Sequence, residues 1–83
     1  MSGDNYLGNS DLRSVICVPS TFNGDEDLWK MVLDTNGYVR IVNKYHNKYL
    51  HLTGDIYNGS LNMKSICGVP ITWNGAEDLW KIE

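Results

Sequence analysis

The sequence predicts an all-β protein, and two observations carry this prediction. Apolar and polar residues alternate with a period of two in Tyr38–Val42 and again in Tyr49–Leu52, which is typical of half-buried strands. Turn-forming dipeptides, such as Asn36-Gly37 and Asn58-Gly59, separate such segments along the chain. No window of ten residues keeps a helical period, because Gly, Pro or Asn-Gly interrupts each candidate.

The predicted strands are, in order, 38–43, 48–53, 60–67 and 78–82. The first two are the alternating segments, and in the third Leu61 and Met63 share one face. In the fourth, Trp80 and Ile82 share one face, which alternation favours as the inward one. The stretch GDIYNG is predicted to be a loop before the third strand, and GVPITWNGAE a long loop before the fourth.

The chain contains an internal repeat. Residues 3–31 align with residues 54–82 at a constant offset of 51 without a gap, and about half of the aligned positions are identical. The best-matched part reads V-P-x-T-(F/W)-N-G-x-E-D-L-W-K. A period near 50 is typical of supersecondary units that stack on one another to bury their apolar faces. We expect one domain, 1–83, with a partial repeat at 3–31 and a full repeat at 37–83, giving roughly six strands.

The second copy resembles one repeat of the ricin-B-type β-trefoil lectins. Those repeats open with Y-x-(I/L)-x-N, continue as G-K-Y-L-D-V-x-G and close with Q-x-W-x-(I/L). The matching segments here are Tyr38–Lys44, Lys48–Gly54 and Asp78–Ile82, and the closing motif recurs at Asp27–Met31. The run beginning TNGYVRI is also similar to the agglutinin domain of the amaranthin lectins, another trefoil family.

The resemblance implies a β-trefoil-like fold with about one and two-thirds repeats, and carbohydrate binding without a cofactor. This chain has His51 where the family has its sugar-binding aspartate, and Glu26-Asp27 and Glu77-Asp78 where the family has a polar Asn-Gln pair. Carboxylates also accept hydrogen bonds from sugar hydroxyls. A complete trefoil has three units. We therefore expect the chain to form a homo-oligomer, to swap strands, to be a fragment of a longer protein, or to adopt a smaller β-fold.

Composition argues against several function classes. The chain has 83 residues and a net charge of −3, opposite in sign to the basic faces of nucleic-acid-binding proteins. Its apolar runs are too short to span a membrane, and its polar start, MSGDNYLG, lacks the pattern of a signal peptide. We expect no nucleic-acid partner, no membrane span, and a cytoplasmic location or release by a non-classical route.

The two cysteines, Cys17 and Cys67, occupy non-equivalent positions of the repeat. A function that fixed a pair of cysteines would make the copies agree, so free and buried thiols are favoured over a disulfide between them. Their spacing does not fit a zinc site. We expect no metal and no cofactor.

Aromatic residues recur at two places in the repeat. Trp29 and Trp80 lie in the closing strand of each copy, where alternation favours a core position over a sugar-stacking one. Phe22 and Trp73 lie in the long loops. A large ring there is either an exposed platform for the CH groups of a sugar or a cap that folds back over the sheet.

Acidic residues recur beside these rings, next to Asn23 and Asn74. Glu26-Asp27 and Glu77-Asp78 are candidate acceptors for sugar hydroxyls, or oxygen ligands for calcium. The structural alternative is that these carboxylates cap loop amides ahead of the closing strand.

A further pair recurs within G-D-x-Y-x-G, as Asp4 with Tyr6 and Asp55 with Tyr57. A carboxylate and an aromatic ring can hydrogen-bond to and stack on one ligand, and an Asx-turn with a packed tyrosine is the structural alternative. His51 has no counterpart in the first copy, and alternation places it on the face opposite the flanking leucines. A plain surface position is favoured over contact with a ligand or with a neighbouring chain.

We interpret the chain as a non-catalytic, carbohydrate-binding, lectin-like homo-oligomer, whose several sites together raise avidity. The alternative is a structural or protein-interaction β-trefoil, such as an inhibitor, toxin subunit or scaffold, without sugar binding. No Ser/His/Asp or Cys/His grouping recurs, so no enzyme activity is expected. The candidate ligand-binding residues are Asp4, Tyr6, Phe22, Asn23, Glu26, Asp27, His51, Asp55, Tyr57, Trp73, Asn74, Glu77 and Asp78.

Overall fold

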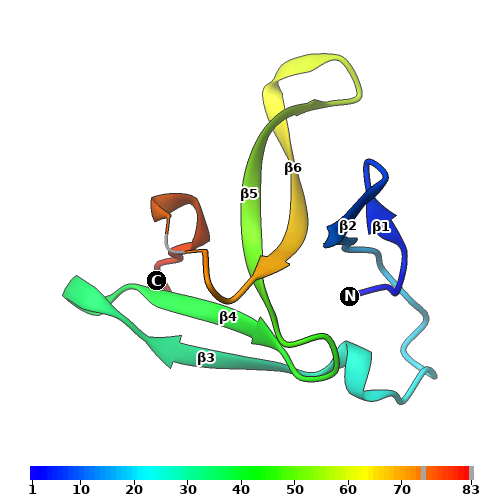
Figure 1. The fold of residues 1–83 in the computed structure, drawn as a ribbon, viewed down its shortest axis with the longest axis horizontal. Helices are drawn as coiled ribbons and strands as arrows, with labels where there is room; N and C mark the ends of the chain where they lie inside the picture. Colours follow the sequence, from blue (N-terminus) through cyan, green and yellow to red (C-terminus); the bar gives the residue numbers. More distant parts are fainter. Residues whose placement is uncertain (74, 83) are drawn as a thin grey trace.

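The computed structural model describes residues 1–73 and 75–82, and there the prediction of an all-β fold is confirmed. The six strands of this part form one antiparallel sheet in the order β1-β2-β6-β5-β4-β3 (Figure 1). The strands are β1 (Asn5–Tyr6), β2 (Asn9–Ser14), β3 (Trp29–Leu33), β4 (Val39–Asn43), β5 (Lys48–Tyr57) and β6 (Ser60–Pro70). Short 3-10 turns lie at Asp25–Asp27, Thr35–Gly37 and Ala76–Asp78.

The two G-D-x-Y-x-G segments form the tips of hairpins, so the expected loop at GDIYNG is wrong. Strand β5 runs on to Tyr57 and β6 starts at Ser60, leaving only Asn58 and Gly59 as the turn. Both have positive φ, 54° and 72°, as a type I′ hairpin turn requires. The β1–β2 hairpin uses the equivalent residues, Leu7-Gly8, with φ of 50° and 73°. The repeat therefore specifies the same turn twice.

The V-P-x-T-(F/W)-N-G-x-E-D segment forms the same loop in the first copy (3–31) and the second copy (54–82). Each copy ends this loop in a 3-10 turn, Asp25–Asp27 or Ala76–Asp78. Three backbone hydrogen bonds recur 51 residues apart in the two copies. In the first copy they are Phe22 N to Pro19 O (3.0 Å), Asp27 N to Gly24 O (3.1 Å) and Leu28 N to Asp25 O (3.2 Å). In the second copy they are Trp73 N to Pro70 O (3.0 Å), Asp78 N to Gly75 O (3.2 Å) and Leu79 N to Ala76 O (3.1 Å).

After this loop the two copies diverge, and the expected strand at 78–82 is wrong. The first copy enters β3, which pairs with β4 over five residues. The second copy makes a single bridge, in which Trp80 and Val39 exchange two backbone hydrogen bonds of 2.8 Å. Trp80 lies at the edge of β4 that faces away from β3, and β5 pairs with the same edge through Val42 of β4 and Tyr49 of β5. Ile82, expected to face inward, is 58 % exposed.

The core is small and partly polar. Its fully buried side chains are those of Val69, Asn43, Asp78 and Cys67. The expected core position of the repeated tryptophans is only half right. Trp80 is half-buried and donates its indole N–H to Leu50 O at 3.0 Å, whereas Trp29 is 37 % exposed.

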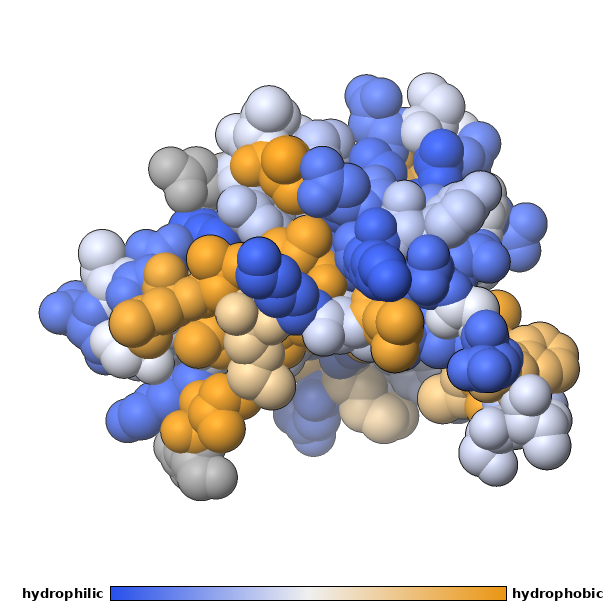
Figure 2. Space-filling model, turned by 90° about the horizontal axis from the view of Figure 1, so that it is seen from below, coloured by the Kyte–Doolittle hydropathy of each residue, from blue (hydrophilic) through white to orange (hydrophobic). Residues whose placement is uncertain are grey.

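The sheet stays open in the part of the chain described here. Strands β2 and β6 pair at only two positions, so the β1–β2 hairpin stands apart from the long β5–β6 hairpin (Figure 1). Many apolar side chains remain on the surface, and several gather on the face seen in Figure 2. None of the helical segments in residues 1–73 and 75–82 has the length and apolar character needed to cross a membrane.

Candidate functional site

Four of the predicted site residues line one pocket of about 290 Å³: Tyr6, His51, Asp55 and Trp73. We call it the Trp73 pocket. Tyr6 comes from β1, His51 and Asp55 from β5, and Trp73 from the loop after β6. The buried side chains of Cys67 and Val69 lie against its wall, and Thr53 and Leu12 complete it. The fold therefore brings together residues that lie up to 67 positions apart in the sequence.

His51 is held inside this pocket, so the predicted surface position is wrong. Its side chain is 16 % exposed, and its Nδ1 is hydrogen-bonded to Asp78 Oδ1. The neighbouring Leu52 is instead 40 % exposed. The ring of Trp73 stands edge-on to the imidazole, with centroids 6.0 Å apart and planes at 86°. Because Nδ1 is engaged by Asp78, Nε2 is the ring nitrogen left for a ligand.

The hydrogen bond with Asp78 holds the His51 ring in position, and the Asp78 side chain is only 1 % exposed. Its second oxygen, Oδ2, has no hydrogen-bond partner and lies 3.7 Å from Arg40 Nη1. Arg40 is buried as well, its guanidinium carbon 5.2 Å from the ring centroid of Tyr49. A buried carboxylate is tolerable only beside such positive or hydrogen-bonding partners. Asp78 does not line the Trp73 pocket, and its carboxylate binds His51 instead of capping a loop amide, so neither alternative for Asp78 describes this arrangement.

Arg40 is further positioned by Asp34. The Nε of Arg40 donates to Asp34 Oδ2 at 2.7 Å. This hydrogen bond, followed by that from the backbone N–H of Thr35, lowers the pKa of the Asp34 carboxyl below its ordinary value. Polar contacts thus run from His51 through Asp78 to Arg40 and Asp34, and Trp73 adds an edge-on aromatic contact to His51. Neither Arg40 nor Asp34 was predicted from the sequence, although a lone charge within an apolar strand is a signal for Arg40.

The two G-D-x-Y-x-G segments meet at the mouth of the pocket. The hydroxyl of Tyr6 donates to Asp55 Oδ2 at 2.9 Å, joining the first copy to the second. The backbone N–H of Asp55 donates to Thr53 Oγ1 at 3.0 Å, which orients the carboxylate. Tyr57 lies outside this pocket and lines a neighbouring one of about 480 Å³ with Tyr6 and Lys64.

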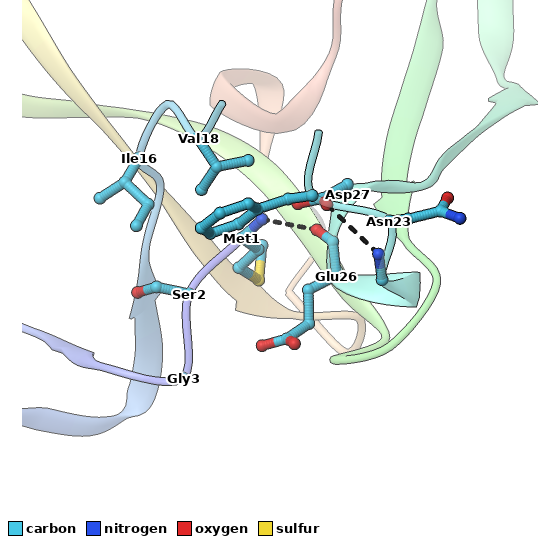
Figure 3. Close-up of a pocket in the computed structure, with 10 residues that line it drawn as sticks. Met1, Ser2, Gly3, Ile16, Val18, Asn23, Glu26 and Asp27 are labelled. Atoms are coloured by element: carbon cyan, nitrogen blue, oxygen red, sulfur yellow. Dashed lines mark hydrogen bonds between the residues drawn. The ribbon is translucent and has the colours of Figure 1, made fainter. Parts of the chain in front are cut away.

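The first copy has a pocket of its own, of about 370 Å³, lined by Phe22, Asn23, Glu26 and Asp27. We call it the Phe22 pocket (Figure 3). The Met1 amino group donates to Glu26 O at 2.7 Å, and the Glu26 carboxylate lies 3.4 Å from His46 Nε2. Asp27 accepts a long bond of 3.5 Å from Gly24 N, so the capping alternative holds for this carboxylate. The amide of Asn23 points away from Met1 and Ile16 (Figure 3).

Two further predicted residues lie apart from both pockets. Asp4 and Glu77 are exposed and line neither of them. Asn74 lies outside the described residues. The two long-loop rings are both exposed, Phe22 by 59 % and Trp73 by 43 %.

The two cysteines are free thiols in different environments. Cys67 is buried and lies opposite His51 across the β5–β6 pair, whereas Cys17 is exposed, so the expected burial of Cys17 is wrong. Burial, followed by the charges of Asp55 and Asp78, raises the pKa of the Cys67 thiol to about 11. Cys67 is therefore held as a thiol, which disfavours any role as a nucleophile.

A pH-dependent loss of stability follows from this raised pKa. Below pH 9 the Cys67 thiol is protonated in both the folded and the unfolded chain. Between pH 9 and about 11 the unfolded thiol ionises while the folded one stays protonated, so stability falls as the pH rises. Urea unfolding midpoints followed at pH 8 and pH 10.5 should fall less in Cys67→Ala than in the unchanged chain. An equal fall in both would contradict the assignment.

Comparisons with protein-family models, with curated proteins and with solved structures find no match to this chain. Within residues 1–73 and 75–82, no group of three or more His, Cys, Asp or Glu side chains is placed to hold a metal ion. The chemistry of the site is thus defined by an exposed indole, an imidazole, a carboxylate and a phenol around one small pocket.

Proposed function

We propose that the chain is a non-catalytic carbohydrate-binding protein and that the Trp73 pocket is its sugar site. The observation that carries this is the convergence of Tyr6, His51, Asp55 and Trp73, from three separate segments, on one pocket. Its volume, about 290 Å³, is at the lower end of the range of ligand sites. A single sugar ring is the ligand class that suits a small pocket with one aromatic wall and several polar groups.

Each side chain has a distinct role in this proposal. The exposed face of Trp73 packs on the CH groups of the sugar, as electron-rich rings do. His51 Nε2 and the Asp55 carboxylate hydrogen-bond to hydroxyls, because each keeps capacity beyond its bond within the protein. Asp78 and Tyr6 hold these two groups in place. Preorganised groups lose less entropy on binding. This favours the Trp73 pocket over the Phe22 pocket, where the carboxylates of Glu26 and Asp27 make longer contacts of 3.4 and 3.5 Å.

The proposal also includes the trefoil-like repeat, a second sugar site and oligomerisation. Each chain is a partial β-trefoil-like unit in which the Phe22 pocket is a second, weaker sugar site. Shallow sites of this kind bind single sugars weakly, and several sites in an oligomer raise avidity by orders of magnitude. A structural or protein-interaction role without sugar binding is the rival, and the exposed apolar side chains are the observation that favours it.

A ligand screen with matched variants tests the sugar site. We expect a glycan array to identify at least one ligand, and isothermal titration with its monosaccharide to give a dissociation constant in the millimolar range. Trp73→Ala should weaken that binding at least tenfold, because it removes the stacking face. Phe22→Ala, at the equivalent position of the first copy, should change it less than threefold. The circular dichroism of both variants should match that of the parent.

Two outcomes would count against the sugar site. A folded chain with no glycan signal would support the protein-interaction rival. Equal losses in Trp73→Ala and Phe22→Ala would place the ligand elsewhere.

A further inference from the structure

Strand β3 (Trp29–Leu33) ends the sheet, and all five of its side chains are exposed. In the part of the chain that the structure describes, it pairs with β4 alone. Met31 is 61 % and Leu33 76 % exposed. Figure 2 views the molecule from the β3 side and shows hydrophobic side chains gathered there. An apolar edge strand is a template for pairing with another chain unless it is blocked.

The exposed area of the chain is large for its size. It exposes 5875 Å², whereas a compact monomer of this mass exposes about 5,000 Å². The surplus of about 900 Å² is close to the roughly 800 Å² that each partner buries in a standard-size protein interface. One self-interface would therefore bring the exposed area down to the usual range.

The backbone of β3 leaves a defined set of groups unpaired. Antiparallel pairs alternate between hydrogen-bonded and non-hydrogen-bonded residues. Lys44 N donates to Leu28 O, and Asp34 N donates to Tyr38 O, which places the even-numbered residues 28–34 in the bonded pairs with β4. The N–H and C=O groups of the odd-numbered residues, Trp29, Met31 and Leu33, must then point outward.

We propose that two copies of this chain form a dimer through antiparallel β3–β3 pairing about a two-fold axis at Met31. This register places Met31 opposite Met31 of the second copy and Trp29 opposite Leu33. All the outward N–H and C=O groups then find partners, in about six hydrogen bonds. The pairing is isologous, so it closes as a dimer instead of growing into a fibre.

Side-chain chemistry supports the same register. Trp29, Met31 and Leu33 lie on one face of the strand, so apolar side chains meet apolar side chains across the interface. Lys30 lies opposite Val32 of the second copy, which avoids placing the two lysines directly opposite each other. The interface uses no residue of the Trp73 pocket, so it is independent of sugar binding.

Three variants test the pairing by sedimentation velocity at 1–200 µM. Leu33→Lys places a charge in the interface, and we expect it to raise the dimer dissociation constant at least 100-fold. Leu61→Lys is the matched control, because Leu61 is 78 % exposed but lies in the β5–β6 hairpin. It should change the constant less than threefold. Met31→Pro removes an outward N–H, keeps the bonds to β4, and should also give a monomer with unchanged circular dichroism.

Amide hydrogen exchange gives a residue-level readout. On dilution from 200 to 1 µM, the amides of Trp29, Met31 and Leu33 should lose protection while those of Lys30 and Val32 keep it. A folded wild-type monomer over the whole range would overturn the proposal. So would a dimer that Leu61→Lys disrupts as strongly as Leu33→Lys, or one in which the odd-numbered amides exchange freely.

Discussion

Asp78→Ala is expected to destabilise the fold by about 3–5 kcal/mol, because removing one partner of a buried ionic cluster leaves the others uncompensated. His51 loses the hydrogen bond that positions it, and Arg40 loses the carboxylate that lies 3.7 Å from its Nη1. Domains of this size are marginally stable, so this loss approaches the whole free energy of unfolding. Urea unfolding followed by far-UV circular dichroism measures it directly.

The repeat supplies the control for this experiment. Asp27 is the first-copy equivalent of Asp78 and ends the same 3-10 turn. Its side chain accepts a 3.5 Å bond from Gly24 N, within its own loop. Asp27→Ala should cost no more than about 1 kcal/mol, the usual worth of a helix cap. If both substitutions destabilise equally, the carboxylate matters for the loop alone, and the cluster around Asp78 contributes nothing.

Asn43→Ala is expected to cost about 2–3 kcal/mol. The side chain of Asn43 is fully buried and links two segments. Its Nδ2 donates to Glu26 O at 2.8 Å, and its Oδ1 accepts from His46 N at 3.0 Å. Alanine leaves the His46 N–H without this acceptor and creates a cavity beside it. The first-copy loop would also lose the hydrogen bond that joins Glu26 O to Asn43 of β4.

A comparison with Asn43→Asp separates the two hydrogen bonds. Aspartate keeps an acceptor for His46 N and loses the donor to Glu26 O, while it adds a buried charge. Both variants should lower the urea midpoint. The loss of stability in Asn43→Asp relative to the parent should be larger at pH 7 than at pH 4, because protonation of the buried aspartate removes its charge and restores a neutral donor. A stability of Asn43→Ala within 0.5 kcal/mol of the parent, about the spread of neutral surface changes, would contradict the linking role.

Local features were predicted well because they depend on neighbouring residues. Alternation marked β4 and the first part of β5, and the Asn58-Gly59 dipeptide marked a tight turn. The two loops share a conformation, since identical residues make identical local bonds. The extent of β5 and β6 was missed because the G-D-x-Y-x-G residues lack apolar alternation and are held by the hairpin turn.

The face on which each residue lies was harder to predict. Alternation gives a period but not a direction, so His51 was assigned to the surface on the strength of its leucine neighbours. In the open sheet Leu52 is exposed, and the inner face is taken by His51, Thr53 and the buried Asp78. The prediction of a strand at 78–82 was wrong for a related reason. Trp80 pairs with β4 at a single bridge, with Val39, and β5 pairs along the same side of β4.

The sequence by itself determined the all-β class, the duplicated loop and hairpin turn, and four of the side chains that line the Trp73 pocket. Tertiary structure decided which of them meet. Tyr6 and Asp55 lie 49 positions apart, and His51 and Asp78 lie 27 apart. The physical reason is that turns and strand periodicity arise from contacts between near neighbours in sequence. Strand order and the burial of charge arise from long-range pairing, which satisfies backbone and side-chain groups together.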